Sequence, residues 1–373
     1  MATFGERMRS LMAERGVSLR RLAKTVHYDA GGLSKVSRDL KSPSPEMARA
    51  LDDALNGGGE LIALAPDRTR LWRPPSTLNG AFTPDVEERL LLAAKRPARV
   101  DSTVVESLST ILAAQRRTED VIGSAPLVEP VRAQLAVIEH LVTEARGGIR
   151  TKVVDVAAQW AQFEAWLQAN LGHLGRADQL YDRAIVWATE AGNNDMVATA
   201  FSMKGHAAWL AGKVGPMLSL SRTAQRAGTS PGVRALAVQQ EARAHAIIGD
   251  AGMTDRKLDD SHMLALAAVE HADDEPPWIY FFNPDLFALQ RARAYLYLPD
   301  RLAAAVELLT AGIGALPAEV RQAEWLAFYL VDLARAYRTL HEDVEAEKIA
   351  VELAELAERI GSRRLAEQTA ALG

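Results

Sequence analysis

Six basic side chains are concentrated in one stretch near the start of this sequence, SLRRLAKTVHYDAGGLSKVSRDLKS, which spans residues 18–42. They are Arg20, Arg21, Lys24, Lys35, Arg38 and Lys41, and within the stretch Asp29 and Asp39 oppose them. The 373-residue chain has a formal net charge of −5, so this segment is a basic patch on an otherwise acidic protein. Guanidinium and ammonium groups bind phosphates, and both can donate hydrogen bonds to guanine O6 and N7. The patch therefore indicates a nucleic-acid contact or, as the simpler alternative, a solvated helix face.

Short helices must hold these side chains in place. Apolar residues at helical spacing predict five helices in residues 1–65. Ser18 and Asp29 are suitable N-caps for the second and third of them, and Gly16 is a stop signal for the first. The break at residues 27–29 predicts a tight turn between the second and third helices.

The third of these helices has two distinct faces. Leu33, Val36 and Leu40 are expected on its buried side. Lys35 and Arg38 fall on the other side and are expected to face solvent or a ligand.

The basic stretch resembles the helix-turn-helix domains of the Cro and lambda-repressor class, also called the xenobiotic-response-element (XRE) family. The likeness lies in the Leu22-Ala23 pair, the Leu33-Ser34 pair, Val36 and the Pro-Ser that follows the third helix. The HY followed by LSKV resembles the version found in large actinobacterial regulators. The resemblance covers about one sixth of the chain and implies a domain at residues 1–65 that binds double-stranded DNA.

Two positions depart from the family pattern, because His27 stands where the family has Gly and Ser37 stands where it has Glu. The resemblance implies nine DNA-contacting residues: Arg20, Lys24, Gly31, Gly32, Ser34, Lys35, Arg38, Lys41 and Ser42. Of these, Lys35 and Arg38 are suited to reading guanine, whereas the residues that flank the reading helix are suited to gripping phosphates. One such domain makes few contacts, so a homodimer on a palindromic operator is expected.

The next two segments separate this domain from the rest of the chain. Residues 66–82 are polar and interrupted by proline, and they predict a linker. Residues 83–149 contain three helical patterns, the first with Thr83 as its cap and Pro84 at its first helical position. We interpret this second segment as a helical spacer.

Residues 150–373 are rich in alanine and resemble degenerate tetratricopeptide repeats, whose first helix needs a small residue where the second helix crosses it. The small residues that set this register are Ala165, Gly205, Ala242, Ala292 and Ala334. They are 37 to 50 residues apart, longer than the usual repeat of about 34 residues. The resemblance implies five repeats with a capping helix at residues 362–372. The predicted fold class is thus all-α, a five-helix helix-turn-helix domain followed by a right-handed α-solenoid with a concave face.

The register also predicts which side chains face the concave side, because the residue after each small one falls there in this family. Candidate ligand-binding residues are these five, Trp166, His206, Arg243, Arg293 and Arg335, together with Phe163, Asn170, Trp209, Gln240 and Gln290. Met203 and Gln239 lie nearby. An aromatic end and a basic end suit a peptide or a small amphipathic ligand with a carboxylate. The alternative is that the arginines only pair with acids on neighbouring helices.

Enzymatic chemistry finds no support in the sequence. There is no cysteine, Walker phosphate loop, H-E-x-x-H or G-x-S-x-G, and the histidines show no metal-ligand spacing. We therefore expect no enzymatic activity, no cofactor and no metal. No window is long and apolar enough for a membrane span, and the N-terminus lacks a signal-peptide core, so a cytoplasmic, nucleoid-associated protein is expected.

Three functions remain open at this point. The first is a transcriptional regulator whose repeat domain senses a ligand, a combination that resembles peptide-sensing regulators of bacterial quorum signalling. The second is a regulator whose repeat domain docks a protein partner. The third is a repeat scaffold whose N-terminal domain does not bind DNA.

Overall fold

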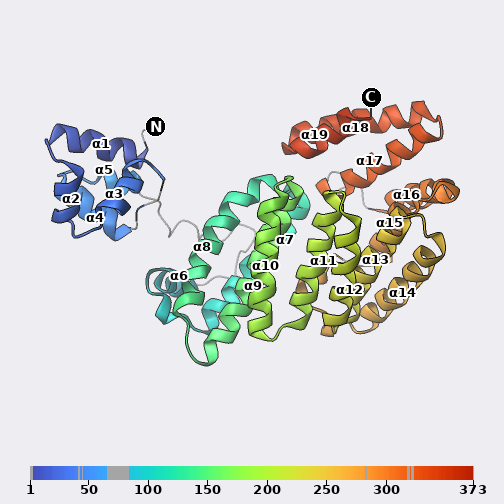
Figure 1. The fold of residues 1–373 in the computed structure, drawn as a ribbon, viewed down its shortest axis with the longest axis horizontal. Helices are drawn as coiled ribbons and strands as arrows, with labels where there is room; N and C mark the ends of the chain where they lie inside the picture. Colours follow the sequence, from blue (N-terminus) through green and yellow to red (C-terminus); the bar gives the residue numbers. More distant parts are fainter. Residues whose placement is uncertain are drawn as a thin grey trace. The chain divides into compact units, whose positions relative to one another are not determined.

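The computed structural model describes residues 3–40, 43, 45–64, 84–281, 284–316, 320 and 323–372 (Figure 1). Every regular element within these ranges is helical, which confirms the all-α class. The chain forms two compact units, Met1–Arg73 and Pro74–Gly373. The predicted linker at residues 66–82 lies outside the described residues.

Five helices form the first unit, as predicted. They are α1 (Phe4–Glu14), α2 (Leu19–Thr25), α3 (Ala30–Ser37), α4 (Pro45–Ala54) and α5 (Glu60–Leu64). The predicted caps are present, since Ser18 Oγ accepts a hydrogen bond from the Arg21 N–H and the Asp29 carboxylate accepts one from the Gly32 N–H. Apolar side chains from all five helices, among them Met8, make one core.

The prediction for Leu40 is wrong, because this side chain is 68% exposed. α3 ends at Ser37, and Asp39 has a φ of 58°, so the backbone leaves the helix before residue 40. The Asp39 carboxylate fixes this exit by accepting hydrogen bonds from Thr3 Oγ1 at 2.6 Å and from the Gly5 N–H at 2.8 Å.

The turn between α2 and α3 carries the backbone strain that the departure from the family pattern suggests. His27 has a φ of 56°, in the left-handed region that favours glycine. A side chain in this conformation costs roughly 1–2 kcal/mol relative to a right-handed one. The hydrogen bond from the Tyr28 N–H to the Ala23 carbonyl, at 3.0 Å, holds the turn closed.

The second unit begins with α6 (Pro84–Lys95), α7 (Ser102–Ile122) and α8 (Val128–Glu144). Five helix pairs follow: α9 (Gly148–Asn170) with α10 (Leu174–Ala191), α11 (Asn194–Leu210) with α12 (Val214–Ala227), α13 (Pro231–Ile247) with α14 (Ala251–Glu270), α15 (Pro284–Tyr295) with α16 (Leu302–Ala315), and α17 (Glu324–Thr339) with α18 (Asp343–Ile360). The helix α19 (Arg363–Ala370) closes the described part of the unit. Short 3₁₀ turns lie at Pro97–Arg99, Ala125–Leu127, Ala272–Asp274, Pro277–Ile279 and Pro299–Arg301.

The helix pairs follow the predicted register. The small residues Ala165, Gly205, Ala242, Ala292 and Ala334 lie in the first helices α9, α11, α13, α15 and α17, and all are buried. Consecutive helices pack side by side through the array (Figure 1). This stacking confirms the helical-repeat solenoid.

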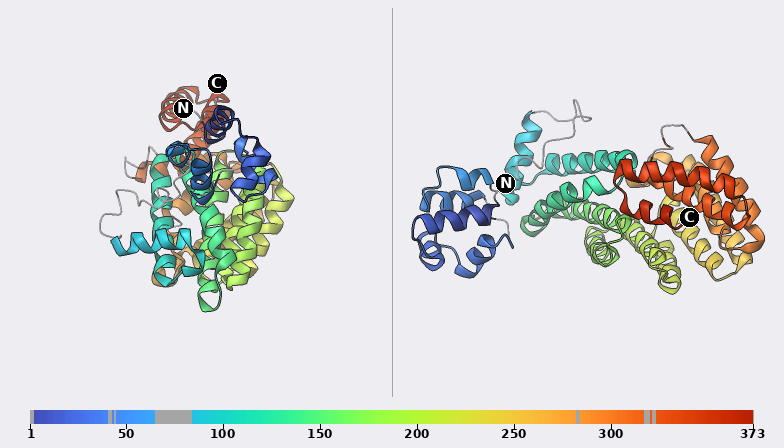
Figure 2. Two further views of the ribbon diagram at one scale, coloured as in Figure 1. Left: turned by 90° about the vertical axis from the view of Figure 1, so that its left-hand side faces the viewer. Right: turned by 90° about the horizontal axis from the view of Figure 1, so that it is seen from above.

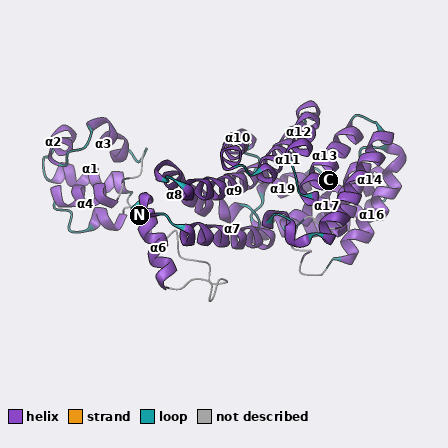
Figure 3. Cartoon of the chain, turned by 90° about the horizontal axis from the view of Figure 1, so that it is seen from below, coloured by secondary structure: helices purple, strands orange, loops and turns teal. Residues whose placement is uncertain are grey.

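The segment interpreted as a separate spacer is part of this unit. α7 packs against α9 and also contacts α17, and Figures 2 and 3 show it running along the repeats toward α17. The Ser124 N–H donates to Glu324 Oε2 at 2.9 Å, which joins positions 200 residues apart. Gly123 has a φ of 79°, and a Cβ there would lie 2.7 Å from the same carboxylate. A glycine therefore permits this close contact. Among the described helices, none is long and apolar enough to cross a membrane.

Candidate ligand-binding cavity and DNA-contacting face

Most of the predicted DNA-contacting residues lie on one surface of the first unit. Arg20, Lys24, Gly31, Lys35 and Arg38 are exposed, and Gly32 and Ser34 are partly exposed. Lys41 and Ser42 lie outside the described residues. None of the four described cations in this set forms an ion pair with a described residue, so their charges are available to phosphates.

The start and end of α3 differ in what they offer. At the start, the Asp29 carboxylate caps the helix at 2.7 Å from the Gly32 nitrogen, and the two glycines leave the backbone open to close approach. At the end, Arg38 Nε donates to the Ser34 carbonyl at 3.2 Å. The other guanidinium N–H groups of Arg38 remain able to donate to a base or a phosphate.

The second unit contains a cavity of about 1200 Å³. α7 and the first helices α9, α11, α15 and α17 line it, together with residues of α18 and α19. Drug-sized ligands usually occupy about 300–1,000 Å³, so this cavity has room for a larger molecule.

Eight of the ten predicted ligand residues line this cavity: Phe163, Trp166, Asn170, His206, Trp209, Gln290, Arg293 and Arg335. The other two, Gln240 and Arg243, do not, and the prediction that they face the concave surface is corrected. Gln240 Nε2 donates to the Ser202 carbonyl at 3.0 Å and is buried between α11 and α13. Arg243 is covered by Trp209, whose ring lies 4.1 Å from the guanidinium carbon.

Sequence reasoning missed the contribution of α7, which it interpreted as a spacer. This helix supplies Arg116, Glu119 and Asp120 to the cavity lining. A signal was present, because Arg116 is buried and continues the spacing of the buried Leu108 and Leu112. A basic residue on the buried face of an amphipathic helix indicates a polar site beneath that face.

Three planar side chains form a row across the cavity. The Trp166 ring lies 5.6 Å from the His206 ring, and the His206 ring lies 5.1 Å from the Trp209 ring. Trp209 Nε1 donates to the Tyr297 hydroxyl at 2.8 Å, which fixes the end of the row. The row offers faces on which an apolar or planar ligand group can stack.

An acidic group lies at the Trp166 end of this row. Glu119 Oε1 accepts hydrogen bonds from Ser124 Oγ at 2.6 Å, from Trp166 Nε1 at 3.3 Å and from Asn170 Nδ2 at 3.4 Å. Burial raises the pKa of Glu119 to about 7 although the Ser124 hydrogen bond opposes the rise. The charges of Asp120 and Glu324 raise this pKa further.

Basic groups surround the other end of the row. Arg293 Nε donates to Asp332 Oδ2 at 2.6 Å, and its guanidinium carbon lies 3.8 Å from the Tyr329 ring centroid. Arg243 Nη2 donates to His206 Nδ1 at 3.3 Å. Burial and the nearby arginines hold the pKa of His206 well below its usual value, so the imidazole is neutral.

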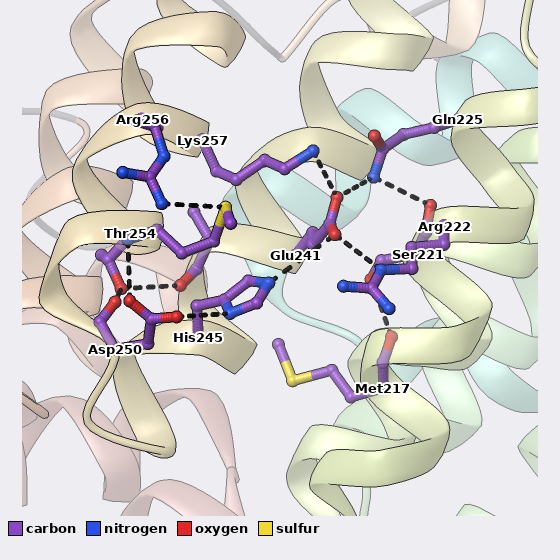
Figure 4. A network of polar contacts seen from close by, with 12 residues as sticks. Met217, Ser221, Arg222, Gln225, Glu241, His245, Asp250, Thr254, Arg256 and Lys257 are labelled. Carbon is purple, nitrogen blue, oxygen red and sulfur yellow. Dashed lines mark hydrogen bonds and ion pairs between the residues drawn. The ribbon is translucent and has the colours of Figure 1, made fainter.

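A second polar cluster, away from the cavity, surrounds Glu241 on α13 (Figure 4). Its carboxylate receives Arg222 Nε at 2.8 Å, Gln225 Nε2 at 2.7 Å and Lys257 Nζ at 3.0 Å. Burial opposes ionisation, but these contacts lower the pKa of Glu241 to about 2. The cluster joins α12, α13 and α14 and is internally neutralised.

Among the residues that the structure describes, no group of three His, Asp or Glu side chains could hold a metal ion. The chemistry of the cavity is therefore recognition by stacking, hydrogen bonding and charge. The separate surface of the first unit offers cationic donors.

The family comparison bears on the first unit. Residues 3–65 match the family model of a helix-turn-helix domain. The first unit is a helix-turn-helix domain. This domain is a DNA-binding fold, and its match agrees with the predicted boundary at residue 65.

Two solved structures are similar to the chain at low identity. The first is titled "Crystal Structure of Rap Protein Complexed with Competence and Sporulation Factor" and has 13% identity and a TM-score of 0.44, covering 98% of this chain and 99% of the other. The second is titled "Circular tandem repeat protein with novel repeat topology and enhanced subunit contact surfaces" and has 16% identity and a TM-score of 0.21, covering 99% and 87%. No curated protein matches the chain.

Proposed function

We propose that this chain is a transcriptional regulator of the XRE type, in which the helix-turn-helix domain binds an operator and the repeat unit senses an effector. The observation that carries the proposal is the presence, in one chain, of a helix-turn-helix domain with unpaired surface cations and a cavity of about 1200 Å³ in the other unit. The effector is a peptide or a small amphipathic molecule. Its apolar part stacks on the Trp166–His206–Trp209 row, and its charged part meets the basic end.

The helix α7 is the element through which an effector acts. It lines the cavity and, through Ser124, contacts Glu324 on α17. In the sequence it follows closely on the segment that joins the two units. An effector shifts the regulator only if it binds the DNA-competent and DNA-incompetent forms with different affinities. A change in the α7–α17 contact is a structural difference of that kind.

The DNA-binding part of the proposal is tested by selecting genomic fragments on the purified protein and measuring affinity for the recovered operator. Lys35→Ala and Arg38→Ala should each cost about 1–3 kcal/mol at the operator and much less on unrelated DNA. Lys24→Ala is the matched comparison, because loss of a phosphate contact weakens all sequences alike and reduces the salt slope by about 0.9. Unchanged operator affinity in both Lys35→Ala and Arg38→Ala would contradict the assigned face.

We further propose that the regulator is a homodimer held together by its repeat unit and bound to a palindromic operator in the cytoplasm. Apolar side chains of the first unit are largely used in its own core, whereas exposed Val186, Met263 and Val269 lie on helices of the second unit. Sedimentation of the full chain and of the fragment 74–373 should both give dimers at micromolar concentration. A monomeric fragment beside a dimeric full chain would move the contact to the first unit.

A further inference from the structure

Arg243 is a buried cation without a counter-ion at the basic end of the cavity. Its side chain is 1% exposed, and it forms no ion pair with any residue in the described ranges. Its Nη2 reaches His206 Nδ1 and Gln240 Oε1, both at 3.3 Å. Its Nε and Nη1 are buried and have no hydrogen-bond partner. Such a group is expensive to bury and calls for a partner.

Arg364 on α19 is a second cation of this kind. It lines the cavity, and its guanidinium carbon lies 4.3 Å from the Phe328 ring centroid. It too lacks an ion pair within the described part of the chain. Glu324 and Asp332 act on it at longer range, but the Glu324 carboxylate accepts the Ser124 N–H and Asp332 is paired with Arg293.

Arg293 lies between these two cations in its electrostatic effect. Burial, and then the charge of Arg293, lower the pKa of both Arg243 and Arg364 to about 10. Both guanidiniums therefore remain charged at neutral pH. With Asp332 committed to Arg293, two positive charges stay uncompensated.

Aromatic faces do not make up the difference. A cation over an aromatic ring gains about 0.5–2 kcal/mol. Removing an ion from water costs several kcal/mol in a protein interior. The rings of Trp209 and Phe328 thus reduce the electrostatic penalty at Arg243 and Arg364 without removing it.

The tautomer of His206 adds a donor to this group. Arg243 Nη2 can only donate, so His206 Nδ1 accepts and the ring proton lies on Nε2. His206 lines the cavity, so this N–H is suited to an acceptor on a bound molecule.

We propose that Arg243, Arg293 and Arg364, grouped around His206, form a subsite for a doubly charged anion on the effector. The anion is a phosphate monoester or a pair of adjacent carboxylates. It bonds to Arg293, Arg364 and the His206 Nε2–H, because planar guanidiniums donate in pairs to such oxygens. Arg243 acts from behind the Trp209 ring by charge. This inference rests on the proposed effector cavity and specifies the chemistry that it recognises.

The test measures melting temperature of the full chain at constant ionic strength with sodium chloride, inorganic phosphate, phenyl phosphate or phenylsuccinate. At ten times the dissociation constant, an anion that occupies the subsite should raise the melting temperature by about 2–4 °C over chloride. Phenyl phosphate acting alone assigns a phosphate monoester, and phenylsuccinate acting alone assigns paired carboxylates.

A matched pair of variants locates the effect. Arg364→Gln should abolish the rise without lowering the melting temperature in chloride. Arg363→Gln should retain it, because the neighbouring Arg363 side chain is 90% exposed and pairs with Glu367. The inference is overturned if no dianion exceeds chloride, or if Arg364→Gln responds like the wild type.

The same samples separate this inference from the proposed function. If the protein binds its operator but no dianion raises the melting temperature, the anion subsite is wrong and DNA recognition stands. If a dianion binds through Arg364 but a saturating amount leaves operator affinity unchanged, the subsite stands and the sensing role is wrong.

Discussion

Glu241 and Arg243 are buried charges on α13, two residues apart, yet their surroundings are opposite. Glu241 receives Arg222 and Lys257 from the flanking helices α12 and α14. Arg243 meets a neutral histidine, an amide and an aromatic ring, and two of its nitrogens have no partner. The first charge is balanced within the protein and serves the fold. The second is unbalanced and is suited to a ligand.

This difference follows the repeat register. Charged residues directly before the small residue find partners on a neighbouring second helix: Glu164 pairs with Arg176, Lys204 with Asp178, Glu241 with Arg222 and Arg291 with Asp259. Residues directly after the small residue turn toward the first-helix side, where four of the five line the cavity. Position in the repeat thus separates stabilising charges from recognising ones.

The largest effect is expected from removing the balanced charge. Glu241→Ala leaves Arg222, Lys257 and Gln225 without their shared acceptor and should lower the free energy of unfolding by about 2–3 kcal/mol. The stabilisation by a dianion should persist in the folded protein. Urea unfolding with and without anion measures both, and Glu355→Ala, an exposed change, is the control with a shift below about 0.5 kcal/mol. Loss of the anion response together with stability would erase the distinction between the two sites.

Acid should act on the balanced charge in a defined window. The pKa of Glu241 in the folded protein, about 2, is below its unfolded value of 4.5. Its contribution is therefore complete above pH 4.5 and is lost as pH falls from there toward 2. The free energy of unfolding should fall less steeply over this range in Glu241→Gln than in the wild type. Equal slopes would show that the Arg222 and Lys257 contacts do not stabilise the ionised carboxylate.

Glu119, at the other end of the cavity, should show the opposite sign. Its folded pKa of about 7 is above the ordinary 4.5, so stability falls as pH rises between these values. Asp120 on its own helix and Glu324 on α17 face it and favour the protonated form. Melting temperature should decline from pH 5 to 7.5 in the wild type and decline less in Glu119→Gln. Glu106→Gln, an exposed change on the same helix, should behave like the wild type.

The smallest effect is expected in the other unit. His27→Gly relieves a left-handed backbone at an exposed position and should stabilise the helix-turn-helix domain by about 0.5–1 kcal/mol. Urea unfolding of the fragment 1–73 measures the change, and Tyr28→Gly, which lacks a positive φ, should instead destabilise it. The dianion response of the full chain should be identical to that of the wild type. A gain that also alters the anion response would show that charge in the repeat unit is not independent of the first unit.

The sequence predicted the repeat register because small residues are required wherever helices cross, and this requirement survives loose spacing. It placed eight of ten cavity residues for the same reason. It failed for Gln240 and Arg243 because α11 side chains, Trp209 among them, lie over them, and such packing between repeats leaves no periodic trace. It failed for Leu40 because α3 ends three residues earlier, at a left-handed Asp39 held by Thr3 and Gly5 from α1.

The role of α7 was out of reach for a different reason. Its contact with α17 joins residues about 200 positions apart, and local pattern carries no information on such closure. His27 shows the converse case, where a departure from the family's glycine correctly indicated strain that the backbone then displays.

The most direct test of the account is Arg243→Met, examined for melting temperature, dianion stabilisation and operator affinity in one preparation. Methionine has a similar reach and carries no charge, so the variant removes an unbalanced buried cation without leaving a large void. The account predicts that it melts at or slightly above the wild-type temperature, keeps its operator affinity without effector, and loses most of the dianion stabilisation. A lowered melting temperature with a normal dianion response would show that Arg243 only stabilises the fold, and would contradict the account.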